Sequence, residues 1–174
     1  LTSWNIGFGA YTDDYSFFMD GGKYSRAFSE SAVVENLTAI GQELADFDTD
    51  FSLIQEVDIA ATRSYQVDER AMLVRSLDAD HTKYWTFAVN YDSPYLFYPL
   101  DQPHGKSVSG LLTLSSFGIT EARRVELPIE TGVMKLVDLD RCYSVHRIPA
   151  ADGRELVLYN VHLSAYTSDG TIAV

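Results

Sequence analysis

Three apolar segments of the sequence each end in polar side chains of a kind that can bind a metal or transfer a proton. These side chains are Asn5 in "SWNIG", Glu56 in "LIQEVD", and Asn160 with His162 in "YNVHLS". Side chains alternate between the two faces of a strand, so Asn160 and His162 point the same way. Because sites in open α/β sheets gather beyond the carboxyl ends of strands, we expect the three strand ends to converge on one pocket.

Glu56 is the candidate metal ligand of this pocket. Burial of a carboxylate is costly unless the group is paired or bound to a metal. A single carboxylate among oxygen ligands suits Mg²⁺ better than Zn²⁺. Structural alternatives stay open at this point: a salt bridge for Glu56, and satisfied polar groups of the core for Asn160 and His162.

The composition limits the kinds of protein that this chain can be. Its 174 residues suit one domain, and its single cysteine, Cys142, excludes an internal disulfide. The net charge is −12, and basic side chains that neutralise phosphates are what duplex binding needs, so strong binding to duplex DNA is not expected. No window approaches the ~20 apolar residues of a transmembrane segment. The chain starts at Leu1 without a methionine, so we expect that an upstream segment was removed, and both a cytoplasmic and a secreted protein fit.

The order of the predicted elements indicates an α/β fold with a mixed sheet. A Ser cap and apolar residues at helical spacing predict a helix over residues 29–47, and "SYQVDERAMLVRSL" predicts a second over 64–77. Predicted strands cover residues 2–6, 50–58 and 84–90, and further strand segments lie within residues 108–127, 135–148 and 154–163. An Asp-Gly turn in "AADGRE" joins the last two.

A long loop is predicted over residues 90–107, "NYDSPYLFYPLDQPHGKS", which hold three of the five prolines. Long loops within compact domains usually have a function. The aromatic residues of this loop could bind a base, a sugar or a lipid, and packing down as a lid or cover is the alternative.

Four segments of the chain resemble the endonuclease/exonuclease/phosphatase superfamily, the DNase I-like metal-dependent phosphoesterases. In order, they are "TSWNIGFG", "DFSLIQEVD", "SGLLTLSSFGI" and "LVLYNVHLSAY", and the resemblance covers essentially the whole chain. It implies a mixed β-sheet sandwich flanked by helices (αββα). It also implies hydrolysis of a phosphodiester or phosphomonoester of a nucleic acid, a lipid or a small molecule. The acidic composition favours a small or lipid-like substrate.

The resemblance assigns roles to the residues at the three strand ends. Glu56 matches the principal Mg²⁺ ligand, at a site that Mn²⁺ could also occupy. Asn5 matches the asparagine that helps to organise the site. His162 matches the histidine that contacts the scissile phosphate and protonates the leaving group, and Asn160 would support the pocket.

Two basic residues are candidates for substrate binding. Arg63 and Lys106 each follow a motif segment that should approach the site. An ordinary solvated position in a loop is the alternative for both.

The chain departs from the family pattern after His162. The family's later Gly-Asp-x-Asn and Ser-Asp-His motifs, which supply further polar ligands and the base histidine, do not occur in it. We therefore expect a single domain over residues 1–174 that is truncated at its C-terminus and is inactive or weakly active by itself. A non-catalytic family member that serves as a binding module is the alternative. A truncated sandwich would leave an apolar sheet face bare, so we also expect self-association or cover by another segment.

Overall fold

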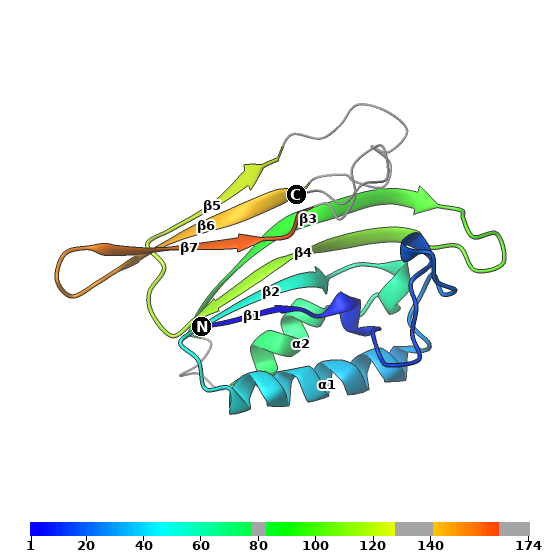
Figure 1. Ribbon diagram of the computed structural model, residues 1–174, viewed down its shortest axis with the longest axis horizontal. Helices are drawn as coiled ribbons and strands as arrows, with labels where there is room; N and C mark the ends of the chain where they lie inside the picture. Colours follow the sequence, from blue (N-terminus) through cyan, green and yellow to red (C-terminus); the bar gives the residue numbers. More distant parts are fainter. Residues whose placement is uncertain (78–82, 128–140, 164–174) are drawn as a thin grey trace.

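The chain folds into two packed β-sheets, with two α-helices against the outer face of one of them (Figure 1). The computed structural model describes residues 1–77, 83–127 and 141–163. The predicted mixed α/β fold with two sheets is confirmed, and the described helices flank one sheet where the sequence implied helices on both sides. In chain order the elements are β1 (Thr2–Asn5), η1 (Gly7–Gly9), η2 (Phe18–Asp20), α1 (Glu30–Asp46), β2 (Phe51–Asp58), η3 (Thr62–Ser64), α2 (Glu69–Ser76), β3 (Tyr84–Leu96), β4 (Gly105–Ser115), β5 (Glu121–Glu126), β6 (Cys142–Pro149) and β7 (Glu155–Val161).

The parallel pairing of β1 with β2 sets the position of the site. The larger sheet has the order β1-β2-β4-β3, in which β4 is antiparallel to both of its neighbours. The smaller sheet is antiparallel with the order β5-β6-β7, and the predicted Asp-Gly turn joins its last two strands. Asn5 pairs with Gln55 at the carboxyl end of β1. Parallel strands end at the same edge of a sheet, so Asn5 lies beside Glu56.

Both helices begin at a side chain that caps them. Ser29 accepts a hydrogen bond from the Ala32 N–H at the start of α1, as the sequence predicted. The predicted start of α2 at residue 64 is wrong, because Tyr65 and Gln66 have left-handed φ angles of 57° and 63°, which a helix does not admit. Asp68 caps α2 by accepting a hydrogen bond from its first turn. No helix in the described part of the chain is long and apolar enough to cross a membrane.

The loop predicted over residues 90–107 is shorter than expected. β3 continues through the first part of it, and Leu96 pairs with Gly105 of β4. The connection between these strands is therefore restricted to residues 97–104. The sequence did not reveal the longer strand because its second half contains Pro94, a residue that strands admit mainly at a sheet edge, and β3 is an edge strand.

Two of the predicted strand segments have different limits in the structure. The segment over residues 108–127 is two strands, because the chain bends at Ser116 and Phe117 and passes from the larger sheet to the smaller one. The segment over residues 135–148 begins as β6 at Cys142, and its residues before 141 lie outside the described part.

The larger sheet is covered on both faces. Its helix side is apolar, and buried side chains that include Ile54, Leu112 and Leu114 form one core with α1 and α2. Its other face meets β6 and β7 (Figure 1). The outer face of the smaller sheet exposes Tyr159 and Val161, and self-association through this face stays a prediction.

Candidate active site

The side chain of Asn5 turns from the end of β1 towards Glu56. Its Nδ2 donates a hydrogen bond of 2.9 Å to Glu56 Oε1. Its Oδ1 accepts a hydrogen bond of 3.0 Å from the Gly7 N–H. An amide has its donor and its acceptor on different atoms, so the two bonds together determine which side of Asn5 faces the carboxylate. The turn that follows β1 thus holds a hydrogen-bond donor against Glu56.

A β-bulge in β2 determines where Glu56 points. In a regular strand Glu56 would share a face with Ile54, which lies in the apolar core under the helices. Ile54 pairs with Leu112 and Val57 pairs with Gly110, so two residues of β2 lie opposite one of β4. Glu56 has a left-handed φ of 56° at this bulge. The bulge brings Val57 into the core and leaves the Glu56 side chain 25% exposed.

His162 reaches the same carboxylate from the second sheet. It directly follows β7, and its Nε2 lies 3.3 Å from Glu56 Oε1. Its side chain is 21% exposed, so part of it is accessible to solvent. The structure therefore brings together Asn5, Glu56 and His162, three residues that the sequence singled out from three different segments.

Asn160 holds β7 against the larger sheet. Its side chain is fully buried, and its Oδ1 accepts a hydrogen bond of 2.8 Å from Gln55 Nε2. Its Nδ2 donates to the Leu112 carbonyl over 3.1 Å and to Thr113 Oγ1 over 3.2 Å. Asn160 thus lies beneath the site and is not open to a substrate. It acts on the site by positioning His162, two residues further along the chain.

The neighbours of Glu56 keep its side chain ionised. Burial alone would raise the pKa of the carboxyl group. The hydrogen bond with His162, the positive charge of Arg63 and the hydrogen bond from Asn5 outweigh burial and lower the pKa of Glu56 to about 2. Glu56 is therefore a carboxylate at neutral pH, in the form that binds a cation.

Comparison with known proteins identifies the fold. Neither a family model nor a curated protein matches the sequence. An endonuclease/exonuclease/phosphatase from Beutenbergia cavernae DSM 12333 superposes on 94% of the chain with a TM-score of 0.64 and 18% identity. An endonuclease/exonuclease/phosphatase family protein from Leptotrichia buccalis C-1013-b superposes on 93% with a TM-score of 0.57 and 14% identity. This chain has the endonuclease/exonuclease/phosphatase fold.

The resemblance inferred from the sequence motifs is thus confirmed at the level of the fold. The chain spans 37% of the length of the first structure and 52% of the second. In this endonuclease/exonuclease/phosphatase fold, the candidate site lies at the carboxyl ends of β1 and β2 and next to the end of β7.

The residues present fit a divalent cation that is held by one carboxylate. Mg²⁺ commonly binds to one or two carboxylates and keeps several waters or substrate oxygens as its other ligands. Asn5 and His162 both contact Oε1 of Glu56, and within the described residues no hydrogen bond or ion pair engages Oε2. Among those same residues no group of three or more His, Cys, Asp or Glu side chains is arranged to hold a metal. Glu56 Oε2 is thus the oxygen that these residues would offer to a divalent cation.

Arg63 does not lie at an open surface, so the geometry does not favour the predicted contact with substrate. Its guanidinium donates two hydrogen bonds, of 2.9 and 2.8 Å, to the carboxylate of Asp58, and both side chains are buried. The guanidinium carbon also lies 3.9 Å from the ring centroid of Phe8. Arg63 affects the site without contact with substrate, since its positive charge helps to lower the pKa of Glu56.

Lys106 is exposed at the start of β4. Its backbone N–H donates to Thr62 Oγ1, which ties β4 to the turn that carries Arg63. This position leaves the Lys106 side chain accessible, and its contact with substrate stays a prediction.

Sequence reasoning missed the buried network behind the site. Asp58 accepts a hydrogen bond of 2.9 Å from Ser64 Oγ in addition to those from Arg63, and Glu69 Oε2 accepts one of 2.9 Å from the Asp58 N–H. Glu69 is fully buried, and burial together with the charge of Asp58 raises its pKa well above the usual range. Nothing local reveals this, because Glu69 follows a capping aspartate and looks like an ordinary first-turn glutamate.

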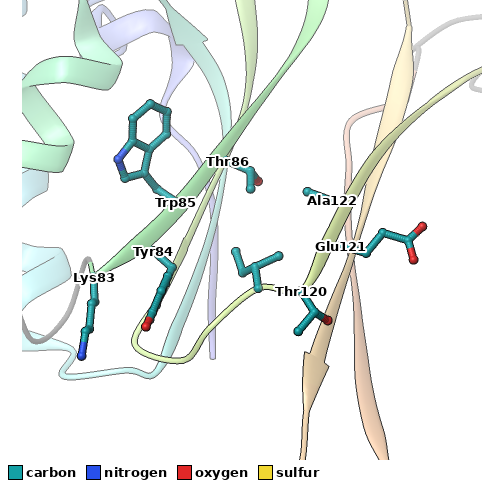
Figure 2. A pocket seen from close by; sticks show the side chains of 8 residues that line it. Lys83, Tyr84, Trp85, Thr86, Thr120, Glu121 and Ala122 are labelled. Carbon is teal, nitrogen blue, oxygen red and sulfur yellow. The ribbon is translucent and has the colours of Figure 1, made fainter.

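The described part of the chain also has a shallow groove of about 320 Å³ between the sheets. Figure 2 shows its lining, with Tyr84 and Thr86 from β3 facing the start of β5 while Trp85 points to the opposite face of β3. Tyr84 and the first residue of β2 both pair with Ser115, so the groove lies at the amino end of β2, away from Glu56. It belongs to a different end of the sandwich from the candidate site.

Proposed function

We propose that this chain carries the metal-ligand and phosphate-contact residues of a Mg²⁺-dependent phosphoesterase. The observation that supports the proposal is the convergence of Asn5 and His162 on one oxygen of an ionised Glu56. Phosphate ester hydrolysis needs a cation to neutralise charge and a proton donor for the leaving oxygen. The site offers a residue for each of these two requirements.

Each residue would have a separate task. Glu56 Oε2 would bind Mg²⁺, with Mn²⁺ as a substitute, and the bound ion would neutralise charge that develops on the phosphate. His162 would contact a phosphate oxygen and donate a proton through Nε2 to the leaving oxygen as the P–O bond breaks. Asn5 would hold the carboxylate in place through its hydrogen bond to Oε1. The general base that activates water is not assigned to a described residue.

The positioning of these groups would depend on buried residues. Asn160 fixes the end of β7, and with it His162, to β2 and β4. Arg63, held by Asp58, supplies the buried positive charge that helps to keep Glu56 ionised. Neither residue would touch the substrate.

Metal binding is the first test, because it does not require turnover. Titration of the full chain with Mn²⁺, followed by calorimetry, is expected to give one site, and Glu56→Gln should weaken it at least tenfold. Glu43→Gln is the matched control, since Glu43 is exposed on α1 and lies outside the site. Equal affinity in the wild type and Glu56→Gln would contradict the assignment of Glu56.

Hydrolysis of bis(p-nitrophenyl) phosphate is the second test. The rate is expected to depend on Mg²⁺ and to fall on Glu56→Gln and His162→Ala, while Glu43→Gln leaves it unchanged. If the chain binds Mn²⁺ and phosphate through Glu56 but releases no nitrophenol, either alone or within a longer protein that also carries the family's later motifs, the non-catalytic binding module is the correct function and the phosphoesterase proposal fails.

A further inference from the structure

Four large apolar side chains are exposed where β3 ends and the connection to β4 begins. Tyr95 is 48% exposed, Phe97 70%, Tyr98 68% and Leu100 86%. We call this group the apolar tip. Single exposed apolar residues are normal on a protein surface, but a run of four within six residues marks a surface that contacts something else.

The apolar tip lies at the same end of the sandwich as the candidate site. Tyr91 of β3 and Asp58 of β2 both pair with Ser109, so they lie at one level along the sheet. Leu96 is five residues beyond Tyr91, which places the tip roughly 15 Å past this level along the strand direction. In Figure 1 the β3–β4 connection projects beyond the ends of the neighbouring strands. The apolar tip and the candidate site therefore lie towards the same end of the larger sheet, the tip on β3 and β4 and the site on β1 and β2.

Hydrogen bonds from His104 and Arg26 hold the connection that carries the apolar tip in one conformation. The His104 N–H donates to the Tyr98 carbonyl over 3.1 Å, and the fully buried His104 ring donates through Nδ1 to the Ser25 carbonyl over 3.1 Å. Arg26 Nε donates to the Pro103 carbonyl over 2.7 Å. The apolar side chains are thus exposed on a segment whose backbone is hydrogen-bonded to the rest of the chain.

The size and shape of the tip fit a fluid surface better than a folded protein. Its four side chains expose roughly 500 Å² in all, since each large side chain offers about 150–250 Å². Stable protein interfaces bury about 800 Å² on each partner. A projecting tip of aromatic residues is suited to the boundary between headgroups and acyl chains of a bilayer, where Tyr keeps its hydroxyl near water.

The charge around the tip selects the kind of lipid. Residues 91–107 contain two aspartates, Asp92 and Asp101, and one lysine, Lys106, and Arg26 contacts the segment at Pro103, so no cluster of basic residues surrounds the tip within the described residues. The whole chain has a net charge of −12. Anionic membranes attract clusters of basic residues and repel an acidic protein. The partner is therefore a surface of zwitterionic headgroups.

We propose that the apolar tip docks on a zwitterionic lipid surface and presents the candidate site to the phosphate esters of that surface. The docking rests on the tip alone. The substrate class, a phosphate ester in a lipid headgroup, rests in addition on the proposed phosphoesterase function.

Sedimentation with vesicles tests the docking without any need for activity. The full chain is mixed with phosphatidylcholine vesicles, and the fraction that sediments with them is measured against lipid concentration. Wild type is expected to bind, and the double variant Phe97→Ser/Leu100→Ser should lower the partition coefficient at least tenfold. Phe117→Ser is the matched control, because Phe117 is 50% exposed at the opposite end of the sandwich and should have no effect. Circular dichroism verifies that each variant is folded.

Three results would overturn the docking proposal. They are failure of the wild type to sediment with phosphatidylcholine, an equal loss of binding in Phe117→Ser, and tighter binding to vesicles that contain phosphatidylserine. Dimerisation in light scattering that is lost in Phe97→Ser/Leu100→Ser would assign the tip to a second copy of the chain and would also overturn it.

A separate variant distinguishes this proposal from the proposed function. Glu56→Gln should bind phosphatidylcholine vesicles as wild type does, because Glu56 lies outside the tip. Vesicle binding without Mg²⁺-dependent hydrolysis of bis(p-nitrophenyl) phosphate or of the lipid, either by the chain alone or within a longer protein that also carries the family's later motifs, would reject the phosphoesterase and retain the docking. Hydrolysis of bis(p-nitrophenyl) phosphate without vesicle binding would reject the docking and retain the phosphoesterase.

Discussion

The two faces of the larger sheet are built from different chemistry. On the helix side, Ile54, Leu112 and Leu114 pack with side chains of α1 and α2 in one continuous apolar core. On the other side, the sheet meets β6 and β7 through a smaller apolar cluster around Leu111 and through hydrogen-bonded polar side chains. The helix-side face is stabilised by burial of apolar area, and the other face is connected to the smaller sheet by hydrogen bonds between particular atoms.

The polar contacts cross between the sheets at several points. Asn160 binds Gln55, Thr86 Oγ1 lies 2.7 Å from His146 Nε2, and the Cys142 N–H donates to Asn90 Oδ1 over 2.8 Å. The three contacts lie at different heights of the sandwich. Thr86 and Asn90 are four residues apart in β3, and Asn160 pairs with Ser144, which lies between Cys142 and His146 in β6.

The two faces have separate roles, one in stability and the other in positioning. Apolar burial is non-directional and roughly proportional to area, so it stabilises the sheet without selecting one register for a second sheet. Hydrogen bonds depend on the positions of particular donors and acceptors. The polar face therefore determines where the end of β7 lies, and with it the distance between His162 and Glu56.

A substitution in the apolar core on the helix side should destabilise the protein most. Leu37 in α1 is 1% exposed in the helix-side core, and Leu37→Ala should lower the free energy of unfolding by about 3 kcal/mol through lost burial and a cavity. Urea unfolding followed by circular dichroism measures it. The Mn²⁺ affinity of the folded fraction should stay as in the wild type, and a large loss of affinity would contradict the separation of roles.

A somewhat smaller effect on stability, with a larger effect on the site, is expected on the polar face. Asn160→Ala removes the hydrogen bonds of this side chain with Gln55 Nε2, the Leu112 carbonyl and Thr113 Oγ1, and should cost about 2 kcal/mol. Because β7 then loses its anchor, the rate of bis(p-nitrophenyl) phosphate hydrolysis in the remaining folded protein should fall at least tenfold. Unchanged activity in a folded Asn160→Ala protein would argue that His162 does not depend on this anchor.

Acid should act on the site through Glu56. The folded-state pKa of Glu56 is about 2, below the ordinary value of 4.5, so its contribution to stability is present above pH 4.5 and is lost as the pH falls towards 2. After allowance for solvent at its exposed side, this contribution is about 1–2 kcal/mol. Urea unfolding of wild type and Glu56→Gln between pH 7 and pH 3 should give two curves that approach each other on acidification. Parallel curves would mean that the pKa of Glu56 is not lowered.

The weakest effect is expected from a substitution that removes a polar contact remote from the site. Thr86→Val keeps the shape of the side chain but takes the hydroxyl away from His146 Nε2, and should cost about 1 kcal/mol. Hydrolysis and Mn²⁺ binding should not change, because Thr86 lies towards the amino end of β3, near the groove of Figure 2. This variant is the control for Asn160→Ala: similar losses of activity in both would show a general loosening of the two sheets.

Several features of the fold could be predicted because their causes are local. The Ser29 cap and the apolar spacing of α1 lie within one segment, and so does the Asp-Gly turn between β6 and β7. The polar residues at strand ends were also visible, since each interrupts an apolar run. General rules on where parallel strands end then predicted that Asn5 and Glu56 would lie close together, as they do.

Other features were decided by tertiary structure alone. The bulge that turns Glu56 out of the core depends on pairing with β4, and the burial of Arg63 depends on Asp58 and Phe8 closing over it. The role of Asn160 depends on Gln55, a residue 105 positions away in the sequence. The amino-acid sequence thus determined which side chains could do chemistry, because residue type and local spacing carry that information. Their distances, charges and exposure arise only when segments far apart in the chain pack together.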